Sequence, residues 1–448
     1  MNGARHLGIL LLCVLPLAAC SPISPIKVLL SNAPLPAESA PPVVHVPASF
    51  DVLIVGGIGT GLKSTGAAEF YNVHGGTFLR TGSLPSRLAG LQTTSLGGGT
   101  VLAAGGSFLL GNYTGGTLTF RGTVTSAASL YNPQTGLFSA GGNMVQPRTL
   151  GTATRLADGS VLIAGGLDPF GTPLRSAEIY QPGTGSFTAV KNMHVPRALH
   201  SATLLNDGDV LIAGGIVDVD GTSTSTAEIY NPATQKFVLL EGVMNQSSSG
   251  QSATLISGCK CARDGQVLLA DGVIGTTSNG NQFEIGNPAA SLYDPRSRTF
   301  SGVVGTTPTD ARIFHTATLL AGGKVLLAGG LEGTIYIGPA GVTGYAGNNI
   351  LASAEIYDPV SSSFSCIDGA ANFKCNAAMV TGRGGHVAAL LTKGSNKGNV
   401  LLAGGLVDSG GVGAPDKSAE LYDPATNTFA ATADMAVPRA FANAVTLP

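Results

Sequence analysis

The sequence predicts an all-β protein, a β-propeller with seven four-stranded antiparallel blades. Three observations lead to this fold class. A short hydrophobic run that ends in two glycines recurs along the chain, a tyrosine follows each run, and a phenylalanine follows each tyrosine at nearly constant spacing. A repeat of roughly 40 to 70 residues is typical of propeller blades, because a unit of that length holds four short strands.

The three signals occur once in each predicted blade. The hydrophobic runs are VLIVGG ending at Gly57, VLAAGG at Gly106, VLIAGG at Gly166 and Gly215, VLLAGG at Gly330 and Gly405, and a variant VLLADG at Gly272. The tyrosines are Tyr71, Tyr131, Tyr180, Tyr230, Tyr293, Tyr357 and Tyr422. The phenylalanines are Phe78, Phe138, Phe187, Phe237, Phe300, Phe364 and Phe429.

Residues 193–237 show the unit most clearly. Four short apolar runs can be separated there, at residues 200–205, 210–213, 227–230 and around Phe237. Asn206, Asp207 and Gly208 predict a tight hairpin between the first two runs, and glycine pairs or Asn-Pro end the others. The pattern therefore predicts a four-stranded meander.

Blade one is split between the two ends of the chain. Residues 51–57 match a second strand, and the matching first strand is found only at residues 439–447. A closed propeller requires these segments to pair, because pairing removes the free sheet edges that invite aggregation.

The same residues resemble the kelch repeat. That repeat combines a double glycine after a hydrophobic strand, a tyrosine followed by Asn-Pro or Asp-Pro, and a closing aromatic residue. Many kelch proteins close the unit with tryptophan, whereas this chain has none and uses phenylalanine. The resemblance covers residues 51–448 and implies a propeller, but it does not imply one function, because kelch propellers include enzymes, scaffolds and ligand-binding modules.

The beginning of the chain predicts export and lipid anchoring. Residues 1–19 are expected to be a signal peptide, with Arg5 before an apolar run at residues 7–15 that is too short to span a bilayer. The sequence LAAC at residues 17–20 resembles a bacterial lipobox, which implies a lipidated Cys20. An ordinary signal peptide with a chance cysteine is the alternative. By the same resemblance, Ser21 after the cysteine favours the outer membrane of a bacterial envelope. The protein could face either the periplasm or the cell surface.

Residues 20–50 are rich in Pro, Ser and Ala and are expected to form a tether. An extended chain of this length would reach about 100 Å, so we expect the propeller at residues 51–448 to move freely above its anchor. Only 11% of residues are charged and the net charge is −2, with no basic run. This composition argues against nucleic-acid binding. We expect a monomeric propeller.

Four cysteines lie in the predicted propeller. Cys366 and Cys375 are nine positions apart between blades six and seven, and we predict a disulfide between them in an oxidising compartment. Cys259 and Cys261 lie in a hairpin of blade five and either pair with each other or remain thiols. A C-x-C pair alone is a weak metal signal, because no further ligands follow at a fitting spacing.

Six arginines recur at one repeat position and are expected around the mouth of the central channel: Arg87, Arg148, Arg197, Arg312, Arg383 and Arg439. Guanidinium groups suit carboxylate or sulfate, so the ring could bind an anion. A structural ring is the favoured interpretation, because glutamates also recur on the third strands: Glu69, Glu178, Glu228, Glu355 and Glu420. Blade five has Ser248 and Ser291 at these two positions, and blade two has Ser129 in place of glutamate.

Other recurring residues are interpreted as structural. His200, His315 and His386 share one repeat position, but the geometry of a propeller holds equivalent positions apart, so we predict no metal site. Met144, Met193, Met244, Met379 and Met435 precede the arginine position and are expected to pack between blades. Asp218 and Asp220 lie in a polar turn that lacks the other ligands of a calcium loop.

Long loops between second and third strands mark the expected binding face. They occupy residues 107–126 in blade two, 273–288 in blade five and 331–353 in blade six. Variable loops on a rigid scaffold are common binding sites.

The sequence contains no catalytic residues that we can assign and implies no cofactor. A copper site of the galactose-oxidase type cannot be assembled, and no catalytic triad order, phosphate loop or zinc motif occurs. We therefore expect a module that binds an unidentified protein or glycan ligand. The alternatives are a carbohydrate-binding or metal-free carbohydrate-isomerising propeller, similar to a sialic acid mutarotase, and a structural spacer in an envelope complex.

Overall fold

The computed structural model describes residues 27–31, 50–114, 117–278, 281–286, 288–337, 343–369, 374–408 and 413–447. The predicted signal peptide, Cys20 and most of the predicted tether lie outside these residues. Within the described residues, no helix combines the length and apolar character that crossing a bilayer would need.

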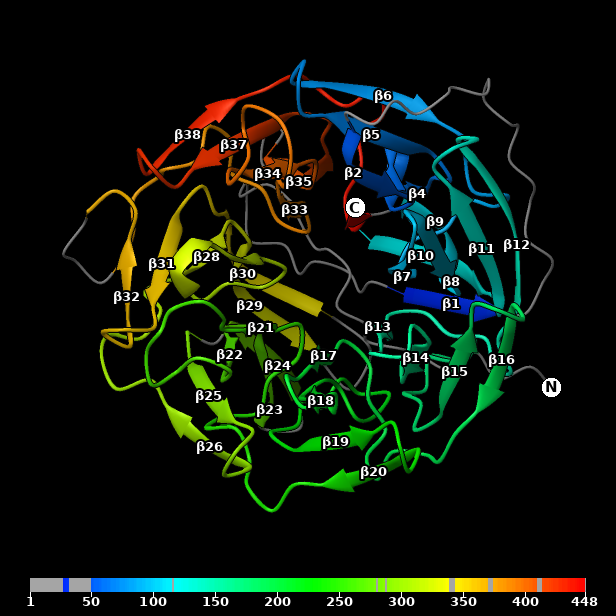
Figure 1. The fold of residues 1–448 in the computed structure, drawn as a ribbon, viewed down its shortest axis with the longest axis horizontal. Coiled ribbons are helices and arrows are strands. Elements are labelled where there is room, and N and C mark those ends of the chain that lie inside the picture. Colours follow the sequence, from blue (N-terminus) through cyan, green and yellow to red (C-terminus); the bar gives the residue numbers. More distant parts are fainter. Residues whose placement is uncertain are drawn as a thin grey trace.

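Seven four-stranded antiparallel sheets form the body of the molecule, as predicted, and they surround a central axis (Figure 1). Blade one contains β39 (Asn443–Thr446), β2 (Phe50–Val55), β5 (Ala68–Asn72) and β6 (Thr77–Thr81). Blade two contains β7 (Gln92–Gly97), β8 (Thr100–Ala104), β11 (Ala127–Asn132) and β12 (Leu137–Asn143). Blade three contains β13 (Thr152–Arg155), β14 (Val161–Ala164), β15 (Ala177–Gln181) and β16 (Ser186–Ala189). Blade four contains β17 (Ser201–Leu204), β18 (Val210–Ala213), β19 (Ala227–Asn231) and β20 (Lys236–Leu239).

The remaining blades repeat this order from the axis outwards. Blade five contains β21 (Ser252–Leu255), β22 (Val267–Ala270), β25 (Ala290–Asp294) and β26 (Thr299–Gly302). Blade six contains β27 (Thr316–Leu319), β28 (Val325–Ala328), β31 (Ala354–Asp358) and β32 (Ser363–Cys366). Blade seven contains β33 (Val387–Leu390), β34 (Val400–Ala403), β37 (Ala419–Asp423) and β38 (Thr428–Ala431). The first strands of neighbouring blades lie next to one another in a closed ring.

The ring is closed by the two ends of the propeller chain. β39 pairs antiparallel with β2, with Val52 opposite Thr446 and Val55 opposite Asn443. The predicted closure is therefore confirmed, and in Figure 1 the red end of the chain lies beside the blue strands of blade one.

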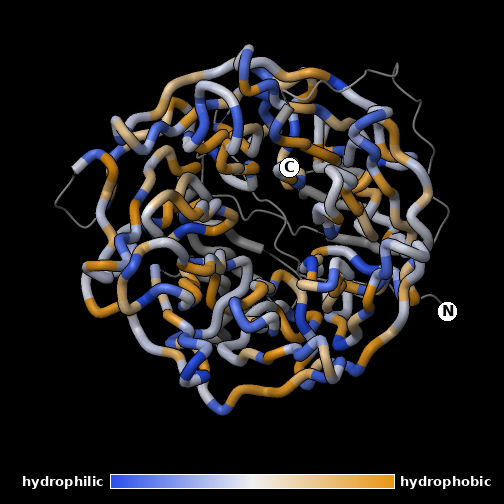
Figure 2. Tube along the Cα trace, viewed as in Figure 1, coloured by the Kyte–Doolittle hydropathy of each residue, from blue (hydrophilic) through white to orange (hydrophobic). Residues whose placement is uncertain are grey.

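The second strand of each blade is the centre of its core. In β18, Val210 and Ile212 pack with residues of blade three, whereas Leu211 and Ala213 pack with residues of blade five. Because side chains alternate along a strand, one uninterrupted apolar run supplies both faces of a blade. Hydrophobic segments accordingly recur around the whole ring (Figure 2).

The double glycine is needed where neighbouring blades meet. Gly165 and Gly166 have φ angles of 59° and 97°, in the left-handed region. A Cβ atom would lie 2.4 Å from the Arg197 carbonyl oxygen at Gly165 and 2.6 Å from the Thr149 carbonyl oxygen at Gly166. Glycine therefore allows both the backbone conformation and the close approach of the next strand.

The recurring tyrosine and phenylalanine are partners in all seven blades. Tyr230 and Phe237 are directly opposite each other on β19 and β20, with ring centroids 4.9 Å apart. Across the seven pairs this distance is between 4.7 and 5.0 Å. Such aromatic cross-strand pairs stabilise the outer half of each sheet.

Strands also form in the loops on one face of the propeller. Blades one and two contribute β3 (Ile58–Gly59), the turn η1 (Thr60–Leu62), β4 (Lys63–Ser64), β9 (Ser107–Thr114) and β10 (Thr117–Val124). Blades five and six contribute β23 (Val273–Ser278), β24 (Asn281–Gly286), β29 (Leu331–Ile337) and β30 (Thr343–Ile350), and blade seven contributes β35 (Leu406–Asp408) and β36 (Gly413–Pro415). The turn η2 (Ala321–Gly323) lies in the hairpin of blade six.

One further strand comes from the predicted tether. β1 (Lys27–Ser31) pairs in parallel with β10, so that Lys27 is opposite Thr119 and Ser31 is opposite Thr123. The expectation of an entirely free tether did not include this strand, because parallel pairing with a distant loop leaves no local signal in sequence.

Candidate functional site

Five of the six predicted ring arginines are buried and paired with glutamate. Arg148, Arg197, Arg312, Arg383 and Arg439 are at most 1% exposed. Their guanidinium nitrogens lie 2.7, 3.3, 2.9, 2.9 and 2.5 Å from carboxylate oxygens of Glu178, Glu228, Glu355, Glu420 and Glu69, respectively. These guanidinium groups are buried and paired inside the protein, so the geometry assigns them a structural role rather than the capture of a dissolved anion.

Each of these arginines also joins two blades. Arg148 Nη1 donates to the carbonyl oxygens of Gly165 at 2.7 Å and Ser176 at 3.0 Å in its own blade. The Arg148 carbonyl oxygen accepts from the backbone N–H of Gly106 in blade two at 2.8 Å. Side chain and backbone together therefore hold neighbouring blades in register.

Arg87 is not a member of this ring. The Leu88 carbonyl oxygen accepts from Gly57 N at 2.9 Å, which is the bond that Arg148 makes with Gly106. The repeat position in blade two is thus Leu88, and Arg87 is exposed one residue earlier. Ser129 was the sequence signal that the ring position of blade two holds no arginine. It replaces the recurring glutamate, and a leucine at the ring position needs no carboxylate partner.

Blade five replaces the ion pair with neutral groups. Ser248 Oγ donates to the Asp271 carbonyl oxygen at 2.8 Å, and Ser291 Oγ accepts from Asn245 N at 3.2 Å. Asp271 takes the place of the first glycine with a φ of 57° and is 2% exposed. Neither carboxyl oxygen has a hydrogen-bond partner among the described residues. Desolvation by burial raises the pKa of Asp271 well above its ordinary value.

The three predicted histidines link the first strands of neighbouring blades. The Nε2 atoms of His200, His315 and His386 lie 3.0, 2.9 and 2.9 Å from the hydroxyl oxygens of Thr152, Ser252 and Thr316 in the preceding blades. Burial lowers the pKa of His200 and of His315 to about 3, and lowers that of His386 well below its ordinary value. The imidazoles are therefore neutral links, each used within a different pair of blades.

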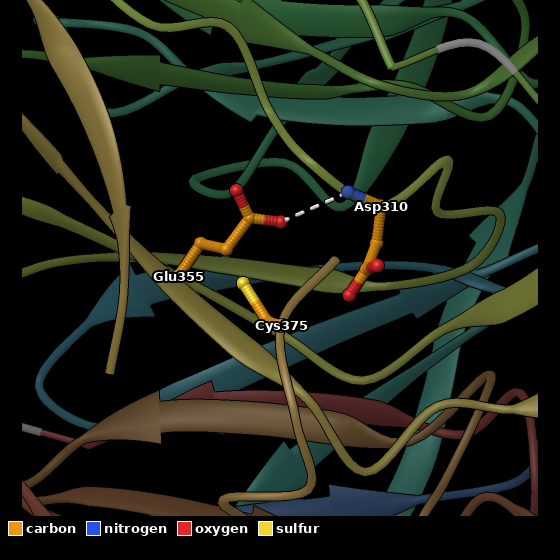
Figure 3. Close-up of side chains that lie close together, drawn as sticks. All are labelled: Asp310, Glu355 and Cys375. Carbon is orange, nitrogen blue, oxygen red and sulfur yellow. Dashed lines mark hydrogen bonds between the residues drawn. The ribbon is translucent and has the colours of Figure 1, made fainter. Parts of the chain in front are cut away.

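A buried cluster in blade six has the residue types of a metal site but not the chemistry. Ligand atoms of Asp310, Glu355 and Cys375 lie within 4.8 Å of one another (Figure 3). Arg312 Nη2 lies 2.9 Å from an oxygen of each carboxylate and supplies the positive charge next to them. Cys375 is bonded to Cys366, and a disulfide sulfur lacks the thiolate that binds metals. Sequence reasoning did not identify this cluster, because Asp310 has no equivalent in the other blades.

Both cysteine pairs are joined in the structure. Cys366 and Cys375 form the predicted disulfide, with their Cα atoms 5.4 Å apart. Cys259 and Cys261, for which the sequence left two alternatives, are also within bonding distance, with Cα atoms 5.2 Å apart. Cys259 and Cys261 lie in the first hairpin of blade five, whereas Cys366 ends β32 and Cys375 lies in the connection to blade seven.

The channel mouth is built from residues two positions after the ring position. These residues are Gly90, Leu150, Leu199, Gly250, Phe314, Gly385 and Phe441, and all have φ angles between 52° and 65°. Large side chains rarely adopt this conformation, and here backbone hydrogen bonds between neighbouring members of the set support it. Leu199 N donates to Leu150 O at 3.1 Å, for example, and Phe441 N donates to Gly385 O at 2.7 Å.

Four of these side chains form what we call the apolar cup: Leu150, Leu199, Phe314 and Phe441. They line a cavity of about 300 Å³, together with Ser107, Leu109, His200 and Gln251 among others. Phe314 and Phe441 meet edge to face, with centroids 5.0 Å apart. None of the lining residues is charged at neutral pH, since the pKa of His200 is about 3.

The loop strands β3, β4, β9, β10, β23, β24, β29, β30, β35 and β36, with η1, form what we call the loop crown. β24 pairs with β29, which joins the loops of blades five and six, and β4 pairs with β9, which joins those of blades one and two. β30 contacts β35, and η1 contacts both β36 and β9, so the crown continues from blade five through blade seven to blade two.

Blades three and four have only short turns at this face. Asp168 Oδ1 accepts from Phe170 N and Thr172 N, and Asp218 Oδ1 accepts from Asp220 N and Thr222 N. The second turn is the polar turn expected from the sequence. The face is therefore asymmetric, with a built-up side over blades five to two and a low side over blades three and four.

The match to a family model agrees with this architecture. The family model for the Kelch motif matches residues 148–194, which begin at Arg148 and include all of blade three. No curated protein matches the sequence. Among solved structures, one described as the structure of YjhT is similar over 77% of this chain and 97% of that chain, with 13% identity and a TM-score of 0.47.

Proposed function

We propose that this β-propeller, one blade of which matches the Kelch motif, is an envelope-anchored binding module that holds a protein partner on the loop crown. The observation that carries the proposal is the asymmetry of this face. Seven equivalent blades would give equivalent loops, but the crown is built over only five of them. Paired strands in long loops supply a defined surface on a rigid scaffold, which is a common arrangement for recognition.

The polar groups of the repeat support binding rather than sugar isomerisation. A carbohydrate pocket at the channel mouth would need arginine and glutamate groups directed at a ligand. The five ring arginines instead bind the recurring glutamates and backbone carbonyls, and the described lining of the cavity is uncharged. The crown is therefore the better candidate for specific contacts.

Anchoring rests on the amino-terminal sequence. We propose that Cys20 carries the lipid and that the protein resides at the outer membrane of a bacterial envelope. Two or more acyl chains on one residue give stable membrane attachment. Fatty-acid labelling of the parent chain, with loss of label and release from membranes in Cys20→Ser, would support the anchor. Membrane retention of Cys20→Ser would contradict it.

The binding proposal is tested by comparing two faces of the same molecule. One variant lacks residues 276–283 at the tip of the β23–β24 hairpin, and the control carries Asn206→Ala and Asp207→Ala in an exposed turn of the opposite face. We expect the parent and the control to retain one protein partner from envelope extracts, with at least tenfold weaker retention by the crown variant. Equal retention by all three would overturn the proposal.

A glycan array on the same proteins separates the alternatives. Saturable binding of one sugar that survives in the crown variant supports the carbohydrate-binding propeller. Retention of neither a protein nor a sugar by the parent supports the structural spacer. Both outcomes contradict a protein-binding crown.

A further inference from the structure

The first hairpin of blade five carries a disulfide that the fold of a blade does not require. This hairpin consists of residues 206–208 in blade four but of residues 257–265 in blade five, although the strands on either side pair in the same register. Blade seven also has a long hairpin, at residues 392–398, and it contains no cysteine. A blade can therefore form with either hairpin length without the pair Cys259 and Cys261.

The hairpin disulfide is more accessible than the second disulfide of the propeller. Cys366 and Cys375 are only 8% and 6% exposed. Cys259 and Cys261 are each half-buried, and exposed Lys260 lies between them. Because thiol–disulfide exchange requires a thiolate to reach a sulfur atom, the hairpin pair is the better target for exchange.

Two further features favour reduction of the hairpin disulfide. It joins cysteines that are two positions apart, compared with nine for the other pair, and the chain-entropy stabilisation by a disulfide increases with the length of the loop that it closes. Inside the short loop, Lys260 has a φ angle of 50°, in the left-handed region that a lysine rarely adopts. Opening the disulfide would allow this residue to relax.

The surroundings distinguish the two sulfur atoms of the hairpin. Cys259 packs against the apolar cluster between blades five and six, and its Sγ accepts from Cys261 N at 3.3 Å. Cys261 Sγ lies 3.8 Å from the Pro359 carbonyl oxygen, which also accepts from Arg263 Nη1 at 3.1 Å. An N–H group directed at Cys259 Sγ stabilises a thiolate there. Asp264 Oδ1, 3.9 Å from the same sulfur, opposes it.

We propose that the Cys259–Cys261 disulfide is a thiol–disulfide exchange site that oxidises peptide and protein dithiols. A thiolate of the incoming dithiol attacks Cys261 Sγ, the bond between Cys259 and Cys261 breaks, and Cys259 leaves as a thiolate. The second thiolate of the dithiol then attacks the mixed disulfide and releases Cys261. The dithiol loses two electrons and two protons to the two cysteines and leaves as a disulfide.

The exchange site lies on the face opposite the loop crown. Strand direction alternates across a blade, so hairpins between first and second strands are at the other end of the sheet from the crown loops. This inference therefore does not depend on the proposed binding function, and none of its tests measures retention of a partner by the crown.

Reduction in glutathione buffers gives the first test. The full-length protein is equilibrated with mixtures of reduced and oxidised glutathione, free thiols are labelled, and each cysteine pair is quantified by peptide mass spectrometry. The Cys366–Cys375 disulfide is the internal control. We expect Cys259–Cys261 to be half reduced at a ratio of squared reduced to oxidised glutathione that is at least tenfold lower. An equal or higher ratio would overturn the proposal.

Oxidation of a peptide with two cysteines separated by two residues tests the activity. We expect the oxidised parent to convert up to one equivalent of this dithiol peptide to its disulfide. The variant with Cys259→Ser and Cys261→Ser should lose at least nine-tenths of the conversion, while hydrogen exchange in β21 and β22 stays unchanged. A parent that reacts no further than this variant would overturn the proposal.

The charge beside Cys259 tests the order of the two cysteines. Asp264→Asn removes the negative charge that opposes the Cys259 thiolate, so we expect peptide oxidation to become at least threefold faster. The matched control is Asp207→Asn, in the corresponding hairpin of blade four, which should leave the rate unchanged. A rate that does not rise in Asp264→Asn would overturn the assignment of Cys259 as the leaving sulfur.

Discussion

Blades four and five have the same strands and the same register but different buried polar groups. Both carry an apolar second strand and a tyrosine–phenylalanine pair, with centroids 4.9 and 5.0 Å apart. Blade four holds Arg197 against Glu228, whereas blade five has serines at both positions. The fold of a blade therefore depends on its apolar run and aromatic pair, and the ion pair is an addition that can be absent.

The polar residues are exchanged as sets. Blade five lacks the arginine and the glutamate together, and so does blade two, which has Leu88 and Ser129. A buried charge without its partner costs several kcal/mol, whereas removing both charges can be nearly neutral. This difference in cost explains why neither the arginine nor the glutamate occurs without the other in these two blades.

The largest expected effect comes from breaking the pair in blade four. Arg197→Ser should lower the free energy of unfolding by about 3 to 5 kcal/mol, because Glu228 stays buried without its partner. Arg197→Ser combined with Glu228→Ser, which copies blade five, should cost less than the single change. Urea unfolding measures both, with the exposed Arg175→Ser as control. A single substitution that costs no more than the double one would contradict this account.

A smaller effect concerns acid stability. The pKa of buried His200 is about 3, below its unfolded value of about 6.5, so its contribution is fully present above pH 6.5 and is lost as pH falls towards 3. His200→Gln, which copies Gln251 of blade five, should remove this loss, worth about 2 kcal/mol at pH 5. Unfolding curves from pH 7 to pH 4 provide the measurement, with exposed His74→Gln as control. An unchanged pH profile would argue against a neutral buried imidazole.

The smallest effect should come from restoring a glycine in blade five. Asp271→Gly removes a buried carboxyl without partners and should raise the free energy of unfolding by about 1 kcal/mol at pH 7. The folded pKa of Asp271 is raised, so wild-type stability falls as pH rises above the unfolded pKa of about 3.9. The gain should therefore grow between pH 4 and pH 7, with Asp220→Gly as an exposed control. A gain that stays constant over this range would mean that the carboxyl is not the cause.

Features encoded in every repeat could be predicted from sequence. The double glycines, tyrosines and phenylalanines gave seven blades, and the split first blade gave the pairing of β39 with β2. The arginine–glutamate ring was also predicted, because both partners recur. These features depend on local patterns that are copied many times.

Features that occur once could not be predicted in this way. The sequence predicts Arg87 as a ring member because it is adjacent to Leu88, and the shift of one residue is visible only in the hydrogen bond from Gly57 N to Leu88 O. The pairing of β1 with β10 and the approach of Cys375 to Asp310 join segments that are distant in sequence. Neither contact has a repeated copy against which it could be recognised.

Because β39 closes the ring, blade one is complete only when the last segment of the propeller is present. Any chain cut short before residue 443 leaves β2 with an unpaired edge in blade one, since Asn443–Thr446 is its partner. The propeller would then have six intact blades and one exposed edge strand, which could pair with a strand of another molecule. Chains truncated before this strand should therefore associate with one another more readily than the full-length chain.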